Sequence, residues 1–281
     1  MTKYKYPRFF PFYDKTVAFF SYFRVMTRKC YFISDAHLGA LAFGDDRERE
    51  RKLCRFLEWA SRDATDLFLM GDIFDFWYEY RYVVPKGHVR LLGCLARIAD
   101  SGVKIHYFIG NHDIWTYGYL AEEIGMTVYR DSVVTEINGY RCFLAHGDRT
   151  GYRSLPLRLT HAIFHSEAVR RLYNTLHPWL NFTFGLAWSR YNRKHKHTQD
   201  SARFLGEDKE YLVQFAKLYD KEHIDFFVFG HRHILLDLQL TSNRRVIYLG
   251  DWIDKFSYAV LDADGMRLEL WEADETPGGS E

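Results

Sequence analysis

The sequence predicts an α/β fold in which a largely parallel sheet comes first and hairpins of antiparallel strands follow. Five short apolar runs are typical of buried strands, and helical patterns lie between the first three of them. The runs span residues 30–34, 67–70, 103–109, 142–145 and 224–229. An alternation of strands with helices is the pattern of a parallel sheet.

Two amphipathic helices are predicted between these strands. Apolar residues recur there at spacings of three and four, as they do on the buried face of a helix. They are Leu53, Phe56, Leu57 and Ala60 in the first helix, and Leu91, Leu92, Leu95, Ile98 and Ala99 in the second. A third helix is predicted at residues 208–222, with Asp208 in its first turn.

From residue 127 onward, short polar turns separate the predicted strands. The turn Asn138-Gly139 is a strong signal for a two-residue hairpin between residues 133–137 and 140–145, which follow a short strand at 127–129. Two further hairpins close the chain, namely 235–240 with 246–249 around Ser242-Asn243, and 258–261 with 266–271 around Asp264-Gly265.

We expect one domain over residues 28–271, with an insertion at about 149–207 and a flexible tail at 272–281. The four cysteines lack CxxC spacing, which favours a reducing compartment, and no run approaches the roughly 20 apolar residues of a membrane span. Residues 1–27 form an extension with two interpretations. It is either a disordered aromatic tail, with Met26 as an alternative start, or an interfacial anchor whose rings are flanked by basic residues.

Each apolar run is followed by side chains that bind cations. Because the carboxyl ends of parallel strands share one rim, we expect these side chains to meet. They are Asp35 and His37, Asp72 and Asp75, Asn111 and His112, His146, and the pair His231 and His233. A lone histidine beside a core is usually structural. A rim of carboxylates and imidazoles, however, is costly to desolvate unless cations neutralise the acids.

Two divalent cations account for these residue types. Asp72 would bridge them at a separation of about 3.5 to 4 Å. The first would be held by Asp35, His37, Asp72 and His233, and the second by Asp72, Asn111, His146 and His231. Ligands without thiolate suit Mn²⁺ or Fe²⁺ with open positions and argue against a closed zinc site.

Such a pair of cations favours hydrolysis at phosphorus, because it lowers the pKa of water and clamps the oxygens of an in-line displacement. We assign His112 to contact with the transition state or the leaving group, with a general-acid role or a purely orienting role as the alternatives. Asp75 is placed to hold a ligand histidine through its second nitrogen.

The blocks "DAH", "GDIFD", "GNHD", "HGD" and "GHRH", in that order, resemble the signature of the calcineurin-like metallophosphoesterases over residues 29–262 apart from the insertion. The resemblance implies a fold of two mixed β-sheets flanked by helices. It also implies the metal ligands, which are Asp35, His37, Asp72, Asn111, His146, His231 and His233. All seven positions are present, which disfavours a scaffold that has lost its chemistry.

The insertion at residues 149–206 is both basic and apolar. It has ten basic and two acidic residues, a net charge of +8, whereas the whole chain carries +1. One interpretation is a helical hairpin that packs on the domain and exposes its basic face. The other is a lid that offers cations to a phosphate and an apolar trough to a lipid. Nucleic acid is a weaker fit, because so many aliphatic and aromatic groups suit an amphiphile better.

Within this family the chain is most similar to the UDP-2,3-diacylglucosamine pyrophosphatases of lipid A synthesis, of the type found in Bacteroidetes. The similar stretches are "SDAHLGA", "GDIFDFWYEY", "VVPKGHVR", "GNHDIWTYGYL", "FGHRHI" and "LGDWI". The likeness implies a helical lid, two divalent ions that we expect to be Mn²⁺, and an acylated nucleotide-sugar substrate. Water would attack the α-phosphorus and give UMP and 2,3-diacylglucosamine 1-phosphate at the cytoplasmic face of the inner membrane, without an obligate protein partner.

Two points of this resemblance leave the substrate contacts open. Many enzymes of that activity carry arginine where this chain has His112, so the assistance to the leaving group differs. We expect the substrate to contact Asn111, His112, Arg190, Arg193, Lys194 and Lys196. The alternative substrate is another nucleotide or a phospholipid-like molecule, cleaved by the same centre as a phosphodiesterase or phosphatase.

Overall fold

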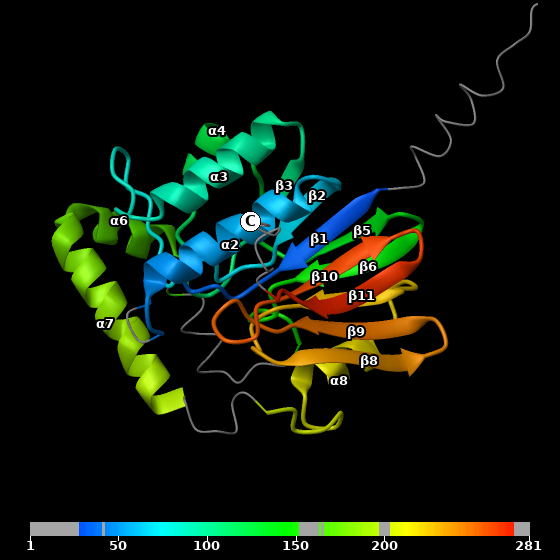
Figure 1. The fold of residues 1–281 in the computed structure, drawn as a ribbon. Helices are drawn as coiled ribbons and strands as arrows, with labels where there is room; N and C mark the ends of the chain where they lie inside the picture. The colour runs from blue at the N-terminus through cyan, green and yellow to red at the C-terminus, as the bar shows by residue number, and fades with distance from the viewer. Residues whose placement is uncertain (1–27, 41–42, 152–162, 164–165, 197–202, 273–281) are drawn as a thin grey trace, which may run out of the picture.

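Two β-sheets packed face to face form the centre of the molecule (Figure 1). The computed structural model describes residues 28–40, 43–151, 163, 166–196 and 203–272. The predicted extension at residues 1–27 therefore lies outside the described residues, as do the tail from residue 273 onward and parts of the insertion.

The first sheet has six strands in the order β11-β10-β1-β2-β3-β4. Strands β1 (Lys29–Ile33), β2 (Ala64–Leu69), β3 (Lys104–Phe108) and β4 (Thr127–Tyr129) pair in parallel, which confirms the predicted first half. The hairpin of β10 (Ser257–Asp262) and β11 (Gly265–Leu270) joins β1 in antiparallel orientation, so the sheet is mixed.

The second sheet has five strands in the order β5-β6-β7-β9-β8. Strands β5 (Val133–Ile137) and β6 (Tyr140–Ala145) form the predicted hairpin, and their turn residues Asn138 and Gly139 have φ of 53° and 83°, as a two-residue turn requires. Strands β8 (Leu235–Thr241) and β9 (Arg244–Leu249) form a second one.

The prediction of hairpins alone is incomplete for this half of the chain. Strand β7 (Phe226–Phe229) pairs in parallel with both β6 and β9. The insertion and α8 lie between β6 and β7 in the sequence and form the crossover that parallel pairing needs. The second sheet therefore also sends the carboxyl ends of parallel strands toward one rim.

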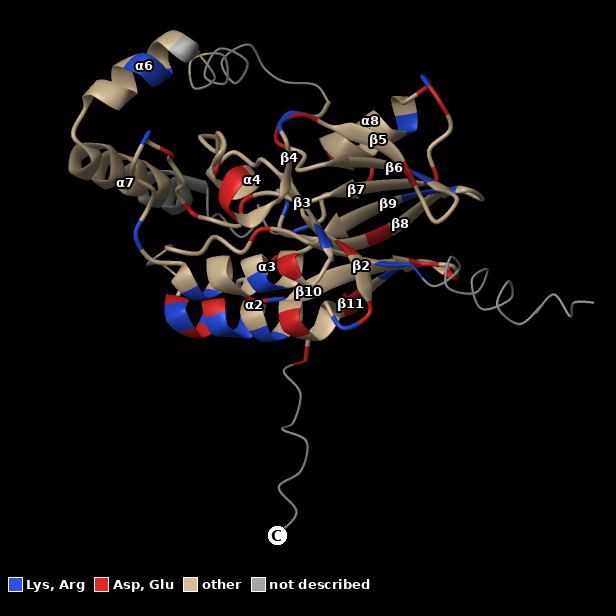
Figure 2. Ribbon diagram, turned by 90° about the horizontal axis from the view of Figure 1, so that it is seen from above, with Lys and Arg blue, Asp and Glu red and all other residues tan. Residues whose placement is uncertain are grey.

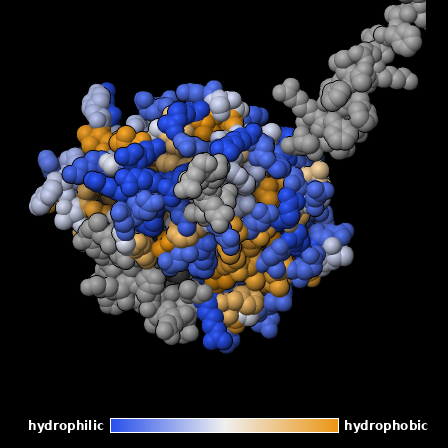
Figure 3. Space-filling model, in the orientation of Figure 1, coloured by the Kyte–Doolittle hydropathy of each residue, from blue (hydrophilic) through white to orange (hydrophobic). Residues whose placement is uncertain are grey.

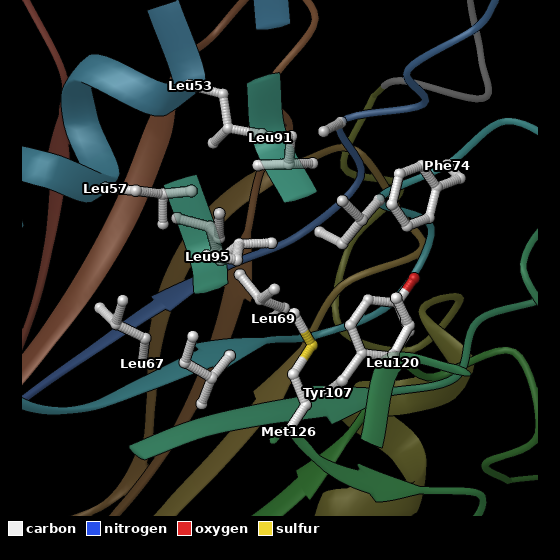
Figure 4. Close-up of a cluster of buried hydrophobic side chains, with 14 of the residues drawn as sticks. Leu53, Leu57, Leu67, Leu69, Phe74, Leu91, Leu95, Tyr107, Leu120 and Met126 are labelled. Atoms are coloured by element: carbon white, nitrogen blue, oxygen red, sulfur yellow. The ribbon is translucent and has the colours of Figure 1, made fainter. Parts of the chain in front are cut away.

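Leucine side chains fix helices α2 (Asp46–Ala60) and α3 (Val89–Asp100) to the outer face of the first sheet. Figure 4 shows this core, in which the helix residues Leu53, Leu57, Leu91 and Leu95 face the strand residues Leu67, Leu69 and Tyr107. Each buried leucine stabilises the fold by roughly 1.5–3 kcal/mol. The predicted helical faces are therefore confirmed as core.

Two further cores complete a layered arrangement of helices, sheet, sheet and helix. Residues of both sheets, among them Phe32, Phe68 and Leu144, pack between the sheets. On the far side of the second sheet, α8 (Tyr211–Leu218) buries Leu212 and Val213 against it. The ends of the strands are thus held from both faces of each sheet.

Helix α8 is shorter than the predicted helix at 208–222, and Asp208 lies in a turn before it. The side chain of Glu210 explains the late start, because it binds Arg232 at 2.9 Å and accepts the Leu205 N–H at 3.3 Å. At the other end Tyr219 has an extended backbone, with φ of −74° and ψ of 111°, which stops the helix.

One short helix, α4 (Tyr119–Ile124), has no counterpart in the prediction. Six residues are too few for a periodic apolar pattern to emerge. The helix depends on a distant residue, because the Glu79 carboxylate accepts hydrogen bonds from the backbone N–H groups of Tyr117, Gly118 and Tyr119. The Glu79 carboxylate thus supplies partners to N–H groups that a helix start leaves unpaired.

The described part of the insertion contains two helices, α6 (Glu167–Thr175) and α7 (Pro178–Lys196), which lie beyond the carboxyl end of β1 (Figure 1). Residues 178–189 of α7 carry no charge, whereas α2 shows residues of both signs (Figure 2). Large apolar side chains of these helices are exposed, namely Leu172 (67%), Trp179 (67%), Phe184 (56%) and Trp188 (46%). Among the described residues, no helix is long and apolar enough to span a membrane.

Candidate metal centre

The predicted ligands lie in loops that leave β1, β2, β3, β6 and β7, and several of these loops are bound to one another through their backbones. The N–H of Asp35 donates to the Gly71 carbonyl at 3.1 Å, and the N–H of His37 donates to the Asp72 carbonyl at 2.9 Å. Across the sheets, the N–H of His231 donates to Asp35 Oδ2 at 2.8 Å. The rim is therefore shared by both sheets rather than formed by one.

Backbone strain is concentrated in these loops. Left-handed φ angles are uncommon for residues other than glycine and cost of order 1–3 kcal/mol each. They occur at Asp35 (56°), His37 (44°), Asp72 (53°), His231 (65°) and His233 (51°). Such angles cluster at functional sites, and here they turn successive side chains toward one point.

The structure brings six of the seven predicted ligands, all but Asn111, together in three groups of carboxylates and imidazoles, in each of which the ligand atoms lie within 4.8 Å of one another. The groups are Asp35 with His37 and His233, His37 with Asp72 and His112, and Asp72 with His146 and His231. The first and third contain the carboxylates and imidazoles assigned to the two predicted cations. The second connects them and also includes His112.

The first group is compact, and two of its three side chains are buried. His233 Nε2 lies 3.2 Å from Asp35 Oδ1 and 3.3 Å from His37 Nε2, and the two rings stack with centroids 5.1 Å apart. Asp35 is fully buried, while the His233 side chain is 30% exposed. His233 is therefore the member of this group most open to solvent.

The third group, Asp72 with His146 and His231, is packed so closely that only glycine fits beside it. His146 Nε2 lies 3.3 Å from Asp72 Oδ2. His146 Nδ1 faces the Met70 carbonyl at 2.8 Å, and a carbonyl only accepts, so Nδ1 carries a proton and Nε2 is the nitrogen that faces Asp72. A Cβ atom at Gly110 would lie 2.2 Å from Asp72 Oδ1.

Burial and charge oppose each other at the two carboxylates. Burial works against ionisation of Asp35, but the neighbouring His233 and His37 outweigh it and hold the pKa of Asp35 below its usual value. Asp72 behaves alike, because His146 and His112 outweigh burial and lower its pKa. Both carboxylates are therefore ionised and able to bind cations at neutral pH.

The histidines divide into two kinds. Burial lowers the pKa of His112 to about 4 and that of His231 to about 3, so both imidazoles are neutral near pH 7. At His146 burial opposes protonation, but Asp72 prevails and raises its pKa well above the usual value. A cation that binds there displaces a proton, which makes metal affinity depend on pH.

The site fits two divalent cations on the chemistry of its own atoms. Asp35 Oδ1 and His146 Nε2 are buried and have no hydrogen-bond partner among the described residues. Buried polar atoms are rarely left in this state, and here they are a carboxylate oxygen and an imidazole nitrogen, both of which bind metal ions. Imidazole and carboxylate ligands without thiolate suit hard or intermediate divalent ions.

The catalytic candidates lie at the edge of these groups. His112 Nδ1 lies 2.9 Å from the Asp75 carbonyl and 3.4 Å from Asp75 Oδ1, so Nδ1 carries the proton. A neutral His112 then has no proton on Nε2 to give to a leaving group, which favours the orienting interpretation over general acid. Asp75 Oδ1 also lies 3.5 Å from His37 Nδ1, and Asn111 is exposed beside His112.

Two supporting acids of this site have no assigned role in the prediction. Asp113, in the "GNHD" block, is fully buried and accepts hydrogen bonds from the N–H groups of Gly110 at 2.7 Å and Ile73 at 3.1 Å. Asp251, in "LGDWI", lies 3.8 Å from His233 Nδ1. The available signal was the place of Asp113 inside a ligand-bearing block and of Asp251 inside a stretch that carries the family resemblance.

The predicted basic contacts of the insertion are only partly located. Arg190, Arg193, Lys194 and Lys196 lie in the last two turns of α7, but their side chains lie outside the described residues. The described part of α7 instead reaches the centre through Ser189, whose hydroxyl lies 3.0 Å from both carboxylate oxygens of Asp75. No pattern in the sequence distinguishes this serine.

Comparisons with known proteins agree with this geometry. The family model described as calcineurin-like phosphoesterase matches residues 28–235. The chain is 40% identical over 263 residues to UDP-2,3-diacylglucosamine hydrolase of Porphyromonas gingivalis, covering 88% of this chain and 99% of that protein. It is 25% identical over 240 residues to UDP-2,3-diacylglucosamine hydrolase of Escherichia coli, covering 84% and 96%. Among solved structures, Yfce, a phosphoesterase from E. coli, aligns with a TM-score of 0.41 and 16% identity over 85% of this chain and 90% of that one. The chain belongs to the calcineurin-like phosphoesterase family.

Proposed function

We propose that the protein hydrolyses the diphosphate of UDP-2,3-diacylglucosamine to UMP and 2,3-diacylglucosamine 1-phosphate, a step of lipid A synthesis. The observation that carries this proposal is a buried cluster of candidate cation ligands in contact with helix α7, whose Ser189 touches Asp75. A relative that is 40% identical bears the name of this activity. The substrate has the matching parts, a diphosphate for the cations and acyl chains for the helix.

The residues of the centre have separate roles in this proposal. When bound, two divalent cations, which we propose to be Mn²⁺, lower the pKa of water and neutralise charge on the phosphoryl oxygens. Asp72, whose Oδ2 lies 3.7 Å from His37 and 3.3 Å from His146, would bridge the two cations. Asp75 orients His37 and His112, and His112 contacts the α-phosphoryl group or its leaving oxygen together with Asn111.

We further propose that the insertion meets the lipid part of the substrate and the membrane surface. Its helices expose Leu172, Trp179, Phe184 and Trp188, and aromatic side chains of this kind insert between lipid headgroups. Figure 3 shows a largely hydrophilic face interrupted by hydrophobic patches, one of them toward the side where α6 lies. The protein would then lie peripherally on the cytoplasmic face of the inner membrane.

The basic end of α7 supplies a second contact in this proposal. Arg190, Arg193, Lys194 and Lys196 follow the uncharged part of the helix directly and would bind the diphosphate. Their replacement by glutamine should raise KM for the nucleotide sugar by about 10-fold or more, with hydrolysis of a small phosphodiester unchanged. Equal losses with both substrates would assign these residues to structure.

The reaction itself is tested with labelled water. The Mn²⁺-loaded protein is incubated with UDP-2,3-diacylglucosamine in H₂¹⁸O, in parallel with bis-p-nitrophenyl phosphate, and the products are identified by mass spectrometry. Attack at the α-phosphorus places ¹⁸O in UMP, whereas attack at the β-phosphorus places it in the lipid phosphate. Hydrolysis of the small diester alone would refute the lipid substrate and favour a phosphodiesterase or phosphatase with another substrate.

A further inference from the structure

One face of helix α7 packs on the segment that follows β2. Asn181, Gly185 and Ser189 are spaced four residues apart, so they lie on the same face of the helix, and all three are buried. A methyl group at Gly185 would lie 2.2 Å from the ring of Phe76. The helix therefore touches this segment without room for a side chain.

The first turn of this face is fixed by an amide. Asn181 is 1% exposed, and its Nδ2 donates to the Tyr173 carbonyl at 2.8 Å and to the hydroxyl of Tyr80. Phe182 meets Phe76 edge to face with ring centroids 5.6 Å apart. These contacts hold α7 against residues 76–80 but touch none of the predicted metal ligands.

The last turn of the same face reaches the metal centre. Ser189 is 4% exposed and Asp75 is 2% exposed, and the serine hydroxyl lies 3.0 Å from each of the two carboxylate oxygens. A carboxylate removed from water needs hydrogen bonds in place of its hydration, and bonds to charged groups are stronger than those between neutral groups. The contact joins residues 114 positions apart in the sequence.

Asp75 in turn faces two imidazoles. Its Oδ1 lies 3.5 Å from His37 Nδ1 and 3.4 Å from His112 Nδ1. His37 Nδ1 has no hydrogen-bond partner among the described residues, so Asp75 acts on it through charge: a carboxylate beside the second ring nitrogen favours the tautomer with the proton on that nitrogen and thereby orients a ligand histidine. With Nδ1 of His37 facing Asp75, Nε2 points to Asp35 and Asp72, each 3.7 Å away.

We propose that Ser189 is a positioning residue of the metal centre, whose hydroxyl holds the Asp75 carboxylate in the place where it orients His37. The insertion thus contributes to cation binding as well as to substrate binding. This inference rests on the proposed function only in that the centre holds divalent cations, and it is independent of the acylated substrate.

Metal binding by the full-length protein tests the inference without turnover. Mn²⁺ is titrated into metal-free protein by isothermal calorimetry for the parent, Ser189→Ala, Asp75→Asn and the double variant. Loss of partners that orient ligands lowers metal affinity by about 10–100-fold, so Ser189→Ala should weaken Mn²⁺ binding by about 10-fold. If Ser189 acts through Asp75, the double variant should bind no more weakly than Asp75→Asn alone.

A matched control separates positioning from packing. Asn181→Ala removes a buried hydrogen bond on the same face of α7, so it should lower the melting temperature while Mn²⁺ affinity stays at the parent value. The inference is overturned if Ser189→Ala binds Mn²⁺ like the parent, if its loss adds fully to that of Asp75→Asn, or if Asn181→Ala loses as much affinity. A parent protein that binds Mn²⁺ and cleaves only the small diester would refute the lipid substrate and leave this test intact.

Discussion

The substitution Gly110→Ala tests directly how tightly the Asp72 carboxylate is packed. The added Cβ atom would lie 2.2 Å from Asp72 Oδ1 and 2.6 Å from the Asp72 backbone nitrogen. An ordinary contact is about 3.4 Å, so the carboxylate must move by about 1 Å, whereas metal ligands tolerate only about 0.2 Å. A misplacement of about 1 Å costs on the order of 100-fold in rate, and overpacking costs typically 1–3 kcal/mol of stability.

The assay compares this variant with a glycine that has space around it. Gly93 lies in α3, and a Cβ atom there would meet nothing within 4 Å. Gly93→Ala should therefore raise the free energy of unfolding by about 0.5–1 kcal/mol and leave kcat unchanged. We expect Gly110→Ala to lower kcat with Mn²⁺ and bis-p-nitrophenyl phosphate by about 100-fold. Parent activity and parent Mn²⁺ content in Gly110→Ala would refute the packing argument.

Three further substitutions address the ligands and the scaffold. Asp72→Ala should abolish turnover and leave fewer than two bound Mn²⁺ ions by atomic absorption. Retained activity with one ion would refute the proposal that Asp72 bridges two cations. His112→Ala should keep two ions and lower kcat by less than the roughly 100-fold expected for loss of a general acid, while loss of metal would make His112 a ligand. Asp66→Asn tests a structural acid: although burial opposes its ionisation, hydrogen bonds from His106 and Arg28 lower the pKa of Asp66. Because the folded-state pKa is lowered, the ionised Asp66 stabilises the protein above about pH 4, and this effect is lost as the pH falls below that. Asp66→Asn should therefore lower the free energy of unfolding, measured in urea at pH 7, by about 1–3 kcal/mol. This loss should become smaller as the pH falls toward 3. An equal difference at both pH values would contradict this assignment.

The sequence could predict which candidate ligands meet at one rim because their signal is local. Asp35, Asp72 and His146 each follow an apolar run that folds as a strand, so the order of the runs places them at one rim. Long-range contacts leave no such signal. A serine in an apolar helix does not reveal that it faces Asp75, and the early part of 208–222 is not helical because Glu210 binds Arg232.

The candidate metal centre has backbone strain and buried charge, which explains why its loops need packing and hydrogen bonds to hold them. Five predicted ligands have left-handed backbone angles, each costing about 1–3 kcal/mol, and two buried carboxylates lie among them. An isolated loop would relax to remove this strain. Here cores on both faces of the two sheets and backbone bonds between the loops, such as His231 to Asp35, prevent that relaxation. The fold holds the carboxylates of Asp35 and Asp72 close together, and bound cations would offset the repulsion between them.

Helix α7 joins this strained centre to the outside of the molecule. Its buried face ends at Ser189 on Asp75, while Phe184 and Trp188, which flank that face, are exposed. Because one rigid helix carries both faces, a ligand that shifted α7 outward by even 1 Å would stretch the 3.0 Å contact beyond hydrogen-bonding range. Changes on the exposed face, such as Trp188→Ala, should therefore alter KM for the acylated substrate without changing Mn²⁺ affinity, unless they move the helix itself.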